Sequence, residues 1–201
     1  MVADAAQMYE EIDGRRILDG LDALIDIHRR RGYIGVALLR GTQLRWWLIR
    51  QLHPMRRPTQ VLTWERIRCG LIAGLLQRTI AVGEAVYRQK VGVPVGGLLS
   101  SIGAALALGA DEARWIKDEI QTFGQAGLTV AGARYVDDVL IMSKLLCKTC
   151  LVKLTESIYT PPVAFELQEG SRQNQPWLDL ALRSEDGQLA IGMKHDELAW
   201  L

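Results

Sequence analysis

Two adjacent carboxylates interrupt the apolar stretch ARYVDDVLIM at residues 133–142. Neighbouring residues of a strand point to opposite faces, so a half-buried strand has no use for both Asp137 and Asp138 in its middle. A tight hairpin resolves this conflict, because its tip directs acidic groups outward while the flanking strands stay buried. A solvated turn without function is the simplest alternative, but Asp-Asp between two valines is a poor turn former. The stretch therefore predicts a hairpin that presents carboxylates.

The rest of the sequence mixes helical and strand patterns. Apolar residues recur at helical spacing in residues 14–28, after Asp13 as a cap, and again after Thr63 as a second cap. Further helices are expected at about 98–121, after a glycine-rich turn, and at 144–158. Strands are expected around residues 128–135, 139–142, 163–167, 177–182 and 189–193, and residues 1–4 have the pattern of a strand end. Helices on an antiparallel sheet predict an α+β fold, which we expect to form a single domain over residues 1–201.

A basic stretch stands out in a chain whose formal net charge is only +1. No Asp or Glu occurs from Ile27 to Trp64, a segment that contains Arg29, Arg30, Arg31, Arg40, Arg45, Arg50, Arg56 and Arg57. Trp46, Trp47 and Trp64 lie among these arginines. Arginines that meet phosphates and flat rings that stack on bases are typical of a nucleic-acid-binding surface. A solvated face next to ordinary core tryptophans is the alternative.

The cysteines and the uncharged run of residues argue against a disulfide-rich, zinc-binding or membrane-spanning protein. Cys69, Cys147 and Cys150 cannot all pair, and they indicate no disulfide framework. Cys147 and Cys150 have the spacing of half a zinc site, but an amphipathic helix with two small residues on one face explains them better. Residues 91–110 carry no charge, yet Pro94 and nearby glycines break their first third, which predicts a buried helix packed on a sheet rather than a membrane span. The N-terminus predicts no signal peptide, so we expect an intracellular protein without a membrane segment.

Carboxylates on a hairpin suit a divalent cation, because Mg²⁺ prefers oxygen ligands. Two-metal phosphoryl transfer usually needs one more carboxylate from elsewhere in the chain, to bridge ions about 3.5–4 Å apart. Asp4 is the best candidate. It is expected to end a short apolar strand, after which the segment VADAAQMYEEID turns into a helix.

These motifs resemble those of reverse transcriptases, which are RNA-directed DNA polymerases. YVDD, from Tyr135 to Asp138, resembles the catalytic hairpin of that family, and VADAAQMYEEID is similar to its first carboxylate motif, with Asp4, Tyr9 and Ile12 in the matching places. The stretch YRQKVGVPVGGLLS at 87–100 resembles the glycine-rich turn and helix that lie against the nucleotide and template. PWLDLAL at 176–182 stands where the family has the hairpin that grips the primer. The motifs follow the family's order over essentially the whole chain.

The resemblance implies a polymerase palm-like antiparallel sheet packed on helices, with residues 160–201 as its C-terminal strands. It implies nucleotidyl transfer with two Mg²⁺ ions, which Mn²⁺ could replace, bound by the catalytic residues Asp4, Asp137 and Asp138. The implied nucleotide-binding residues are Tyr9, Gly92, Pro94, Gly96, Gly97 and Tyr135. Tyr9 would stack beneath the incoming sugar and exclude a 2′-hydroxyl, while the glycines would let the backbone approach the nucleotide. The expected partners are an RNA template, a DNA primer and deoxynucleoside triphosphates, and we assign nucleic-acid binding to Arg29, Arg30, Arg31, Arg45, Trp46, Gln89 and Trp177.

Departures from the family pattern leave alternatives open. Val95 stands where the family usually has Gln, and only three residues precede Asp4, whereas the family places its basic fingers upstream. We therefore expect a palm fragment, from a mobile element, with residues 28–65 as a basic insertion. An RNA-dependent RNA polymerase is disfavoured, because its hairpin usually has Gly before Asp-Asp and a smaller residue where Tyr9 stands. The alternative of a different class is a non-catalytic relic, a folded palm that binds nucleic acid and keeps its metal site but cannot hold a triphosphate.

Overall fold

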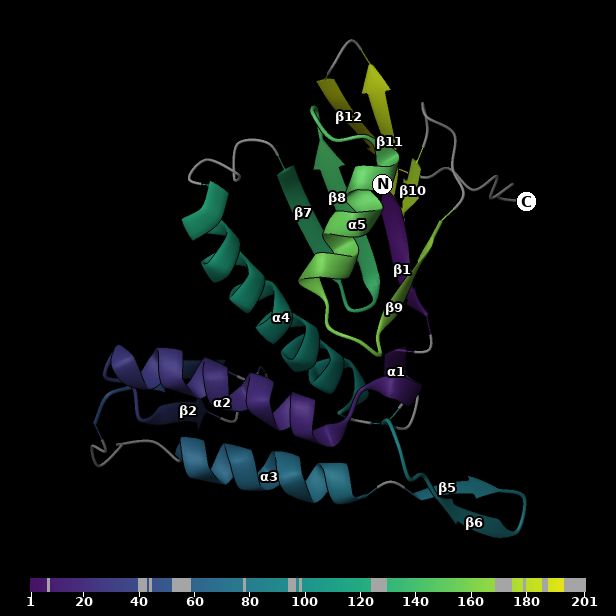
Figure 1. Ribbon diagram of the computed structural model, residues 1–201. Coiled ribbons are helices and arrows are strands. Elements are labelled where there is room, and N and C mark those ends of the chain that lie inside the picture. Colours follow the sequence, from purple (N-terminus) through teal and green to yellow (C-terminus); the bar gives the residue numbers. More distant parts are fainter. Residues whose placement is uncertain are drawn as a thin grey trace, which may run out of the picture. The chain divides into compact units, whose positions relative to one another are not determined.

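The computed structural model describes residues 1–201 apart from 7, 40–42, 44, 52–58, 78, 94–96, 98, 124–129, 169–174, 179, 186–187 and 194–201. The chain divides into two compact units, Met1–Met8 with Asp111–Leu201, and Tyr9–Ala110. Each unit combines helices with antiparallel sheets, as Figure 1 shows. The predicted α+β class is therefore confirmed, whereas the single domain over 1–201 stays a prediction.

The unit with the acidic hairpin is built on a four-stranded antiparallel sheet in the order β7–β8–β1–β9. Its strands are β7 (Val130–Tyr135), β8 (Asp138–Ser143), β1 (Val2–Ala6) and β9 (Ala164–Leu167). The two inner strands, β8 and β1, contribute the buried apolar residues Val2, Ala3, Val139, Leu140 and Ile141. Burial of these side chains explains why the N-terminal segment lies in the middle of the sheet, although it is far in sequence from both of its neighbours.

A second sheet of this unit follows β9 in sequence and shares its core. It has the order β10–β11–β12, with β10 at Gln175–Trp177, β11 at Leu180–Glu185 and β12 at Gln188–Met193. The prediction of one strand over 177–182 is wrong, because the chain reverses at Leu178, where φ is 55°, and Trp177 pairs with Leu180. Trp177 packs against a cluster of Val2, Leu140 and Leu182, which joins this hairpin to the first sheet.

The helix α5 (Lys148–Ile158) contacts β9, the strand that follows it. It was expected from residue 144, but Ser143 Oγ accepts hydrogen bonds from the N–H groups of Leu145 and Leu146, both at 3.1 Å, and holds that segment in a turn. Cys147 is then the N-cap, and its sulfur accepts from Cys150 N at 3.5 Å. The expected pair of small residues on one face of a helix is therefore corrected: Cys147 is the cap, and its Sγ lies 3.2 Å from Cys150 Sγ at an exposed position.

The unit Tyr9–Ala110 contains two long helices, a small sheet and a hairpin. The helices are α2 (Gly14–Arg30) and α3 (Trp64–Leu76), and the short helix α1 (Met8–Glu11) precedes them. The predicted caps are confirmed, since Asp13 accepts a hydrogen bond from Arg15 N at 3.2 Å and Thr63 accepts one from Arg66 N at 3.4 Å.

The sheet of this unit has the order β3–β2–β4, and its strands are β2 (Gly35–Leu39), β3 (Arg45–Ile49) and β4 (Thr59–Thr63). The basic segment 28–65 thus contains this sheet, while β5 (Thr79–Val82) and β6 (Ala85–Arg88) form the hairpin.

The helix α4 (Ser100–Phe123) begins in this unit and packs on α2 through glycines. A Cβ added at Gly20 would lie 2.3 Å from the carbonyl oxygen of Leu106, and one at Gly103 would lie 2.8 Å from Ile17 Cδ1. The expectation that residues 91–110 pack on a sheet is therefore corrected, because the small residues serve a close crossing of two helices. Among the helices that the structure describes, none has the length and apolar character needed to cross a membrane.

Candidate functional site

The predicted acidic hairpin forms between β7 and β8. Tyr135 pairs with Asp138, so Val136 and Asp137 are the turn residues and Asp138 is the first residue of β8. The expectation that both carboxylates lie at the tip is corrected, because Asp137 alone of the two is a turn residue. Val136 has a φ of 55°, which is unusual for a β-branched side chain and falls at a position where two-residue hairpin turns usually carry glycine.

Asp4 lies directly opposite Asp138 on the neighbouring strand, which confirms the expectation that the first carboxylate motif meets the hairpin. Cross-strand partners have their side chains on the same face of a sheet. The N–H of Ala5 donates to the carbonyl oxygen of Asp137 at 3.2 Å and ties the turn to β1. Asp4 is in the middle of β1 rather than at its end, because the strand continues to Ala6.

Two polar residues of the β9 segment, which the sequence patterns did not reveal, complete this part of the sheet. Glu166 lies opposite Asp4 on the side away from Asp138, so one face carries the row Asp138–Asp4–Glu166 across three strands. Gln168 Nε2 donates to Asp138 Oδ1 at 3.0 Å. No local signal marks Glu166 or Gln168, since both reach the site through the pairing of β9 with β1.

Burial and mutual repulsion raise the pKa values of two of these carboxyl groups. For Asp4, burial is the larger cause and the negative charges of Asp137 and Asp138 add to it. For Asp138, burial and the charge of Asp137 raise the pKa, and the hydrogen bond from Gln168 offsets part of this increase. The carboxylates are therefore close enough to repel one another, and a bound cation would relieve that repulsion.

The chemistry of these ligands fits a hard divalent cation, which prefers carboxylate oxygens. Within the described residues, no three or more side chains of His, Cys, Asp or Glu are already arranged to hold an ion. One oxygen of Asp138 is also engaged by Gln168. Cation binding at this row would therefore need the carboxylate side chains to reorient.

The predicted nucleotide-binding residues Tyr9 and Gly92 meet in the unit Tyr9–Ala110. The N–H of Val93 donates to the carbonyl oxygen of Tyr9 at 2.6 Å, and a Cβ at Gly92 would lie 2.4 Å from that oxygen. Gly92 also has a φ of 76°. The chain's own backbone therefore requires glycine here, and contact of Gly92 or Tyr9 with a nucleotide stays a prediction.

The remaining nucleotide-binding candidates are spread over the chain. The carbonyl oxygen of Gly97 accepts from the N–H and the hydroxyl of Ser100, at 3.1 and 2.6 Å, where α4 begins. Tyr135 is 62% exposed at the end of β7. Pro94 and Gly96 lie outside the described residues. No role of these residues in nucleotide binding is tested by the structure.

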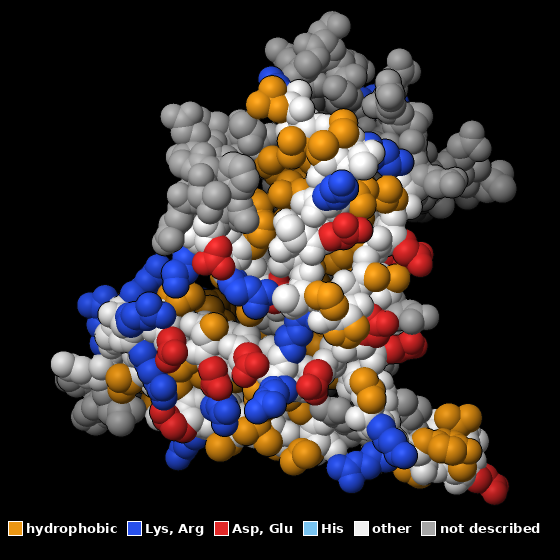
Figure 2. All heavy atoms as spheres, in the orientation of Figure 1, with side chains coloured by type: hydrophobic (Ala, Val, Ile, Leu, Met, Phe, Trp, Pro, Cys, Tyr) orange, Lys and Arg blue, Asp and Glu red, His pale blue; other side chains and the backbone are white. Residues whose placement is uncertain are grey.

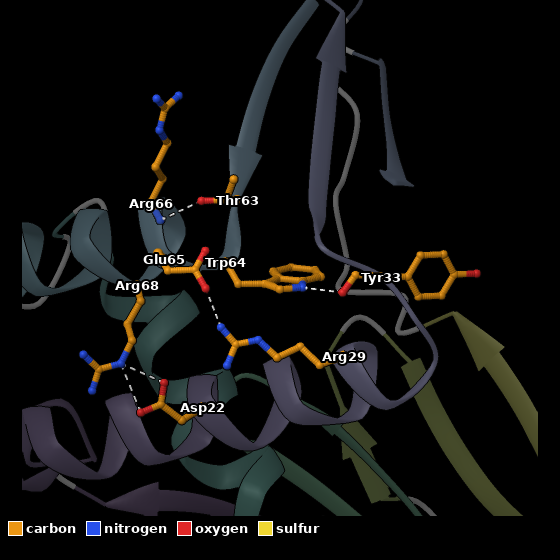
Figure 3. A network of polar contacts seen from close by, with 8 residues as sticks. All are labelled: Asp22, Arg29, Tyr33, Thr63, Trp64, Glu65, Arg66 and Arg68. Atoms are coloured by element: carbon orange, nitrogen blue, oxygen red, sulfur yellow. Dashed lines mark hydrogen bonds and ion pairs between the residues drawn. The ribbon is translucent and has the colours of Figure 1, made fainter. Parts of the chain in front are cut away.

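The predicted nucleic-acid-binding arginines of α2 take part in polar contacts within their own unit. Figure 3 shows two ion pairs that join α2 to α3, one between Arg29 and Glu65 and one between Arg68 and Asp22. Arg29 Nη2 lies 2.5 Å from Glu65 Oε1, and Arg68 Nε lies 2.8 Å from Asp22 Oδ1. Arg30 Nε donates to the carbonyl oxygen of Asp26 at 3.3 Å. On the face in Figure 2, basic and acidic side chains are interspersed over these helices. These contacts favour the solvated-face alternative for Arg29 and Arg30, while Arg31 is exposed at the C-cap of α2.

The tryptophans of the basic segment have different environments. Trp64 is buried, its Nε1 donates to the carbonyl oxygen of Tyr33 at 2.8 Å, and its ring stacks on His28 with centroids 5.6 Å apart. Trp64 is therefore a core aromatic. Trp46 is 66% exposed on β3, next to the exposed Arg45, and stacking on a base would require such an exposed aromatic side chain.

The last two candidates, Gln89 and Trp177, lie in different surroundings. Gln89 lines a cavity of about 780 Å³ together with basic Arg15, Arg88 and Lys90 and with apolar residues of α2 and α3. Trp177 is half-buried on the core cluster of its own unit, which is a structural role. Nucleic-acid binding by either residue stays a prediction.

Comparison with known proteins shows similarity of fold. No protein-family model matches the sequence, and no curated protein matches it. Solved structures of telomerase, a reverse-transcriptase-related enzyme, are similar. Telomerase from Candida albicans, in complex with the TWJ fragment of telomeric RNA, matches 94% of this chain with a TM-score of 0.58 and 15% identity, and apo telomerase from Candida tropicalis matches 96% with a TM-score of 0.60 and 14% identity. A C-terminally truncated form of the latter matches 94% with a TM-score of 0.57 and 12% identity.

This chain spans about a third of the length of those telomerases, with coverage of 30%, 31% and 34% of their chains. Its fold is similar to that of part of the telomerase chain. The palm-like fold implied by the motifs is therefore confirmed at the level of fold.

Proposed function

We propose that this chain is the palm part of an RNA-directed DNA polymerase, in which Asp4, Asp137 and Asp138 bind the divalent cations of nucleotidyl transfer. The observation that carries the proposal is the register of the central sheet, which sets Asp4 opposite Asp138 beside the hairpin turn. The similarity of fold to telomerase supports the same class of enzyme. The partners would be an RNA template, a DNA primer and deoxynucleoside triphosphates.

Bound Mg²⁺ or Mn²⁺ would supply the activation of a primer 3′-hydroxyl and the neutralisation of the leaving pyrophosphate. The chain's own residues prepare the site for these ions. Asp4 and Asp138 present oxygens on one sheet face, and the N–H of Ala5 holds the Asp137 backbone. Gln168 donates a hydrogen bond to Oδ1 of Asp138, so that carboxylate would reorient when a cation binds.

The second candidate function is a nucleic-acid-binding relic of such an enzyme. Such a relic would keep the row of carboxylates on the central sheet but would lack the basic groups that position a triphosphate. Both candidates predict binding of nucleic acid. They differ in whether the chain's carboxylates take part in nucleotidyl transfer.

The test of the proposal is a Mn²⁺ titration of the 201-residue chain at neutral pH. We expect saturable binding by the wild type and strong loss of binding in both Asp137→Asn and Asp138→Asn. Asp19→Asn is the matched control, because Asp19 is a carboxylate of α2, outside the acidic row. A wild-type chain that binds no Mn²⁺, or whose binding is unchanged in Asp137→Asn, would contradict the proposed metal site.

A further inference from the structure

Arg134 of β7 lies beneath the hairpin turn and contacts its backbone. Its side chain is only 12% exposed, and its Nη1 donates to the carbonyl oxygen of Val136 at 2.9 Å. Val136 is the turn residue with a φ of 55°. A valine at positive φ is costly and persists only where the surrounding structure imposes it. The hydrogen bond from Arg134 is one such constraint, and it acts on the residue directly before Asp137.

Glu112 and Tyr159 hold the guanidinium group of Arg134 in place. Arg134 Nε and Nη2 donate to the two carboxylate oxygens of Glu112 on α4, with Nη2–Oε2 at 3.2 Å. The hydroxyl of Tyr159, which follows α5, donates to Glu112 Oε1 at 2.8 Å. An arginine held by two parallel hydrogen bonds has a defined orientation, unlike a lysine, and its third nitrogen is then directed at a fixed point.

Arg134 and Tyr159 both keep their protons at neutral pH. Burial alone would lower the pKa of Arg134, but the hydrogen bond and charge of Glu112 outweigh it, and the pKa is raised. Burial and the charge of Glu112 also raise the pKa of Tyr159, which therefore keeps its proton as a donor. Arg134 and Tyr159 therefore both remain hydrogen-bond donors at neutral pH.

The other carbonyl of the turn is held from the opposite side of the hairpin. The carbonyl oxygen of Asp137 accepts from the N–H of Ala5, which follows Asp4 on β1, at 3.2 Å. Both turn residues, Val136 and Asp137, are therefore bonded through their carbonyl oxygens to residues outside the turn. The turn is fixed between the network of α4 and the strand that carries Asp4.

We propose that Arg134, oriented by Glu112 and Tyr159, is a positioning residue that imposes the positive-φ turn at Val136. It thereby sets Asp138 opposite Asp4, and Asp137 in the adjoining turn, for cation binding. This inference rests on the proposed function, because it concerns the same carboxylates. It goes further, since it assigns a structural cause for their placement to three residues, Arg134, Glu112 and Tyr159, that lie outside the row of carboxylates.

The test uses variants that remove the contact without leaving a buried charge unpaired. Single removal of Glu112 or Arg134 would leave the partner's charge uncompensated and risks unfolding, so the double variant Glu112→Gln/Arg134→Gln is used. We expect it to fold and to bind Mn²⁺ on the order of ten-fold more weakly than the wild type, as loss of outer-shell support does at other metal sites. Arg68→Gln is the matched control, because Arg68 also pairs with a carboxylate, Asp22, but both of these side chains are more than 40% exposed; its Mn²⁺ affinity should equal that of the wild type.

Val136→Gly distinguishes positioning from a general effect on charge or folding. Glycine adopts positive φ without strain, so the turn then needs no external constraint. In the background of the double variant, Val136→Gly should recover most of the lost Mn²⁺ affinity. Recovery supports the proposal. Unchanged affinity in the double variant, or a loss that Val136→Gly does not recover, would overturn it.

A readout without metal keeps this inference separate from the proposed function. Amide exchange of Ala5 reports the turn directly, because its N–H bonds to the carbonyl oxygen of Asp137. The double variant should exchange this proton several-fold faster than the wild type, and Val136→Gly should restore the slow rate. If the wild type bound no Mn²⁺, the proposed metal site would be wrong. The exchange rates would still show whether Arg134 positions the turn. Equal exchange in the wild type and the double variant would overturn the positioning role even where Mn²⁺ binds.

Discussion

The pairing of strands places Asp4 next to other negatively charged side chains. Asp4 has Asp138 opposite it on one neighbouring strand and Glu166 opposite it on the other. Like charges directly across a sheet destabilise it, and nothing in the packing of β1 requires a carboxylate at this position. A destabilising charge in the middle of a strand that is otherwise apolar is expected where the charge serves a ligand.

Replacement of Asp4 by Asn should stabilise the protein at pH 7. The pKa of Asp4 is raised in the folded state, first by burial and then by Asp137 and Asp138, so the folded protein holds this proton more strongly than the unfolded chain does. Stability is therefore lost as the pH rises through the raised pKa, and Asp4→Asn removes that loss. We expect the melting temperature of Asp4→Asn to exceed that of the wild type by about 1–3 °C at pH 7.

The pH dependence is the control for this prediction. Near pH 3, below the ordinary pKa of 3.8, the carboxyl group is protonated in both states and the two melting temperatures should converge. Thermal unfolding followed by circular dichroism between pH 3 and pH 7 measures the difference. A difference that persists at low pH would show that a packing change, rather than charge repulsion, separates the two proteins.

At the scale of elements, the crossing of α2 and α4 depends on a glycine. Gly20→Ala would set a Cβ at 2.3 Å from the Leu106 carbonyl oxygen, which belongs to rigid backbone. We expect the free energy of unfolding to fall by about 1–3 kcal/mol, the usual cost of overpacking. Gly70→Ala on α3 is the matched control: its Cβ would meet nothing within 4 Å, and it should stabilise the helix by roughly 0.4–1 kcal/mol. Urea unfolding of both variants measures the effect, and destabilisation of equal size at both glycines would argue against the crossing.

Nucleic-acid binding can be tested at the C-terminal end of α2, which carries the arginines, and on strand β3, which carries Trp46. If residues of the basic segment bind a single strand, replacement of Arg29, Arg30 and Arg31 should reduce the slope of log affinity against log salt by about one for each phosphate that is no longer bound. Trp46→Ala should weaken binding without a change in that slope, because stacking is not ionic. Fluorescence anisotropy of a labelled RNA at several KCl concentrations measures both quantities.

Glu65→Gln supplies the control for the arginines. It removes the ion pair of Arg29, so a true phosphate-binding role predicts tighter RNA binding in this variant. Arg68, which pairs with Asp22, offers a second comparison on the same pair of helices. RNA binding that is independent of salt would instead favour a solvated face, in agreement with the contacts in Figure 3.

At the scale of the whole molecule, metal binding and polymerisation are expected to separate. A triphosphate carries several negative charges, and the ions need additional basic groups to position it. We therefore expect the 201-residue chain to bind divalent metal and primer–template but to extend primers poorly. A chimera with a reverse-transcriptase fingers region ahead of Met1 should incorporate deoxynucleotides on an RNA template, and Asp137→Asn in that chimera should abolish incorporation.

The two possible failures of this experiment point to different conclusions. Robust synthesis by the 201-residue chain would show that the basic groups needed for the triphosphate are already within it. A chimera that binds Mn²⁺ and primer–template but remains inactive would instead favour the non-catalytic relic.

Features that depend on neighbours along the chain could be predicted from the sequence. The caps Asp13 and Thr63 were predictable because a side chain reaches N–H groups two or three residues away. The acidic hairpin was predictable because alternation along a strand cannot accommodate Asp137 next to Asp138. The order of the motifs indicated a palm-like fold, and the pairing of Asp4 with that hairpin followed from the chemistry expected of it.

The surroundings of these residues, in contrast, depend on tertiary packing. Gln168 reaches Asp138 across 30 positions of sequence, Glu112 reaches Arg134 across 22, and Tyr159 reaches Glu112 across 47. Trp64 and Trp46 belong to the same arginine-rich segment, yet only packing makes the first a core aromatic and leaves the second exposed. Such contacts form when burial of apolar side chains brings distant strands and helices together. A pattern of neighbouring residues in the sequence therefore does not predict which distant residue will contact a given side chain.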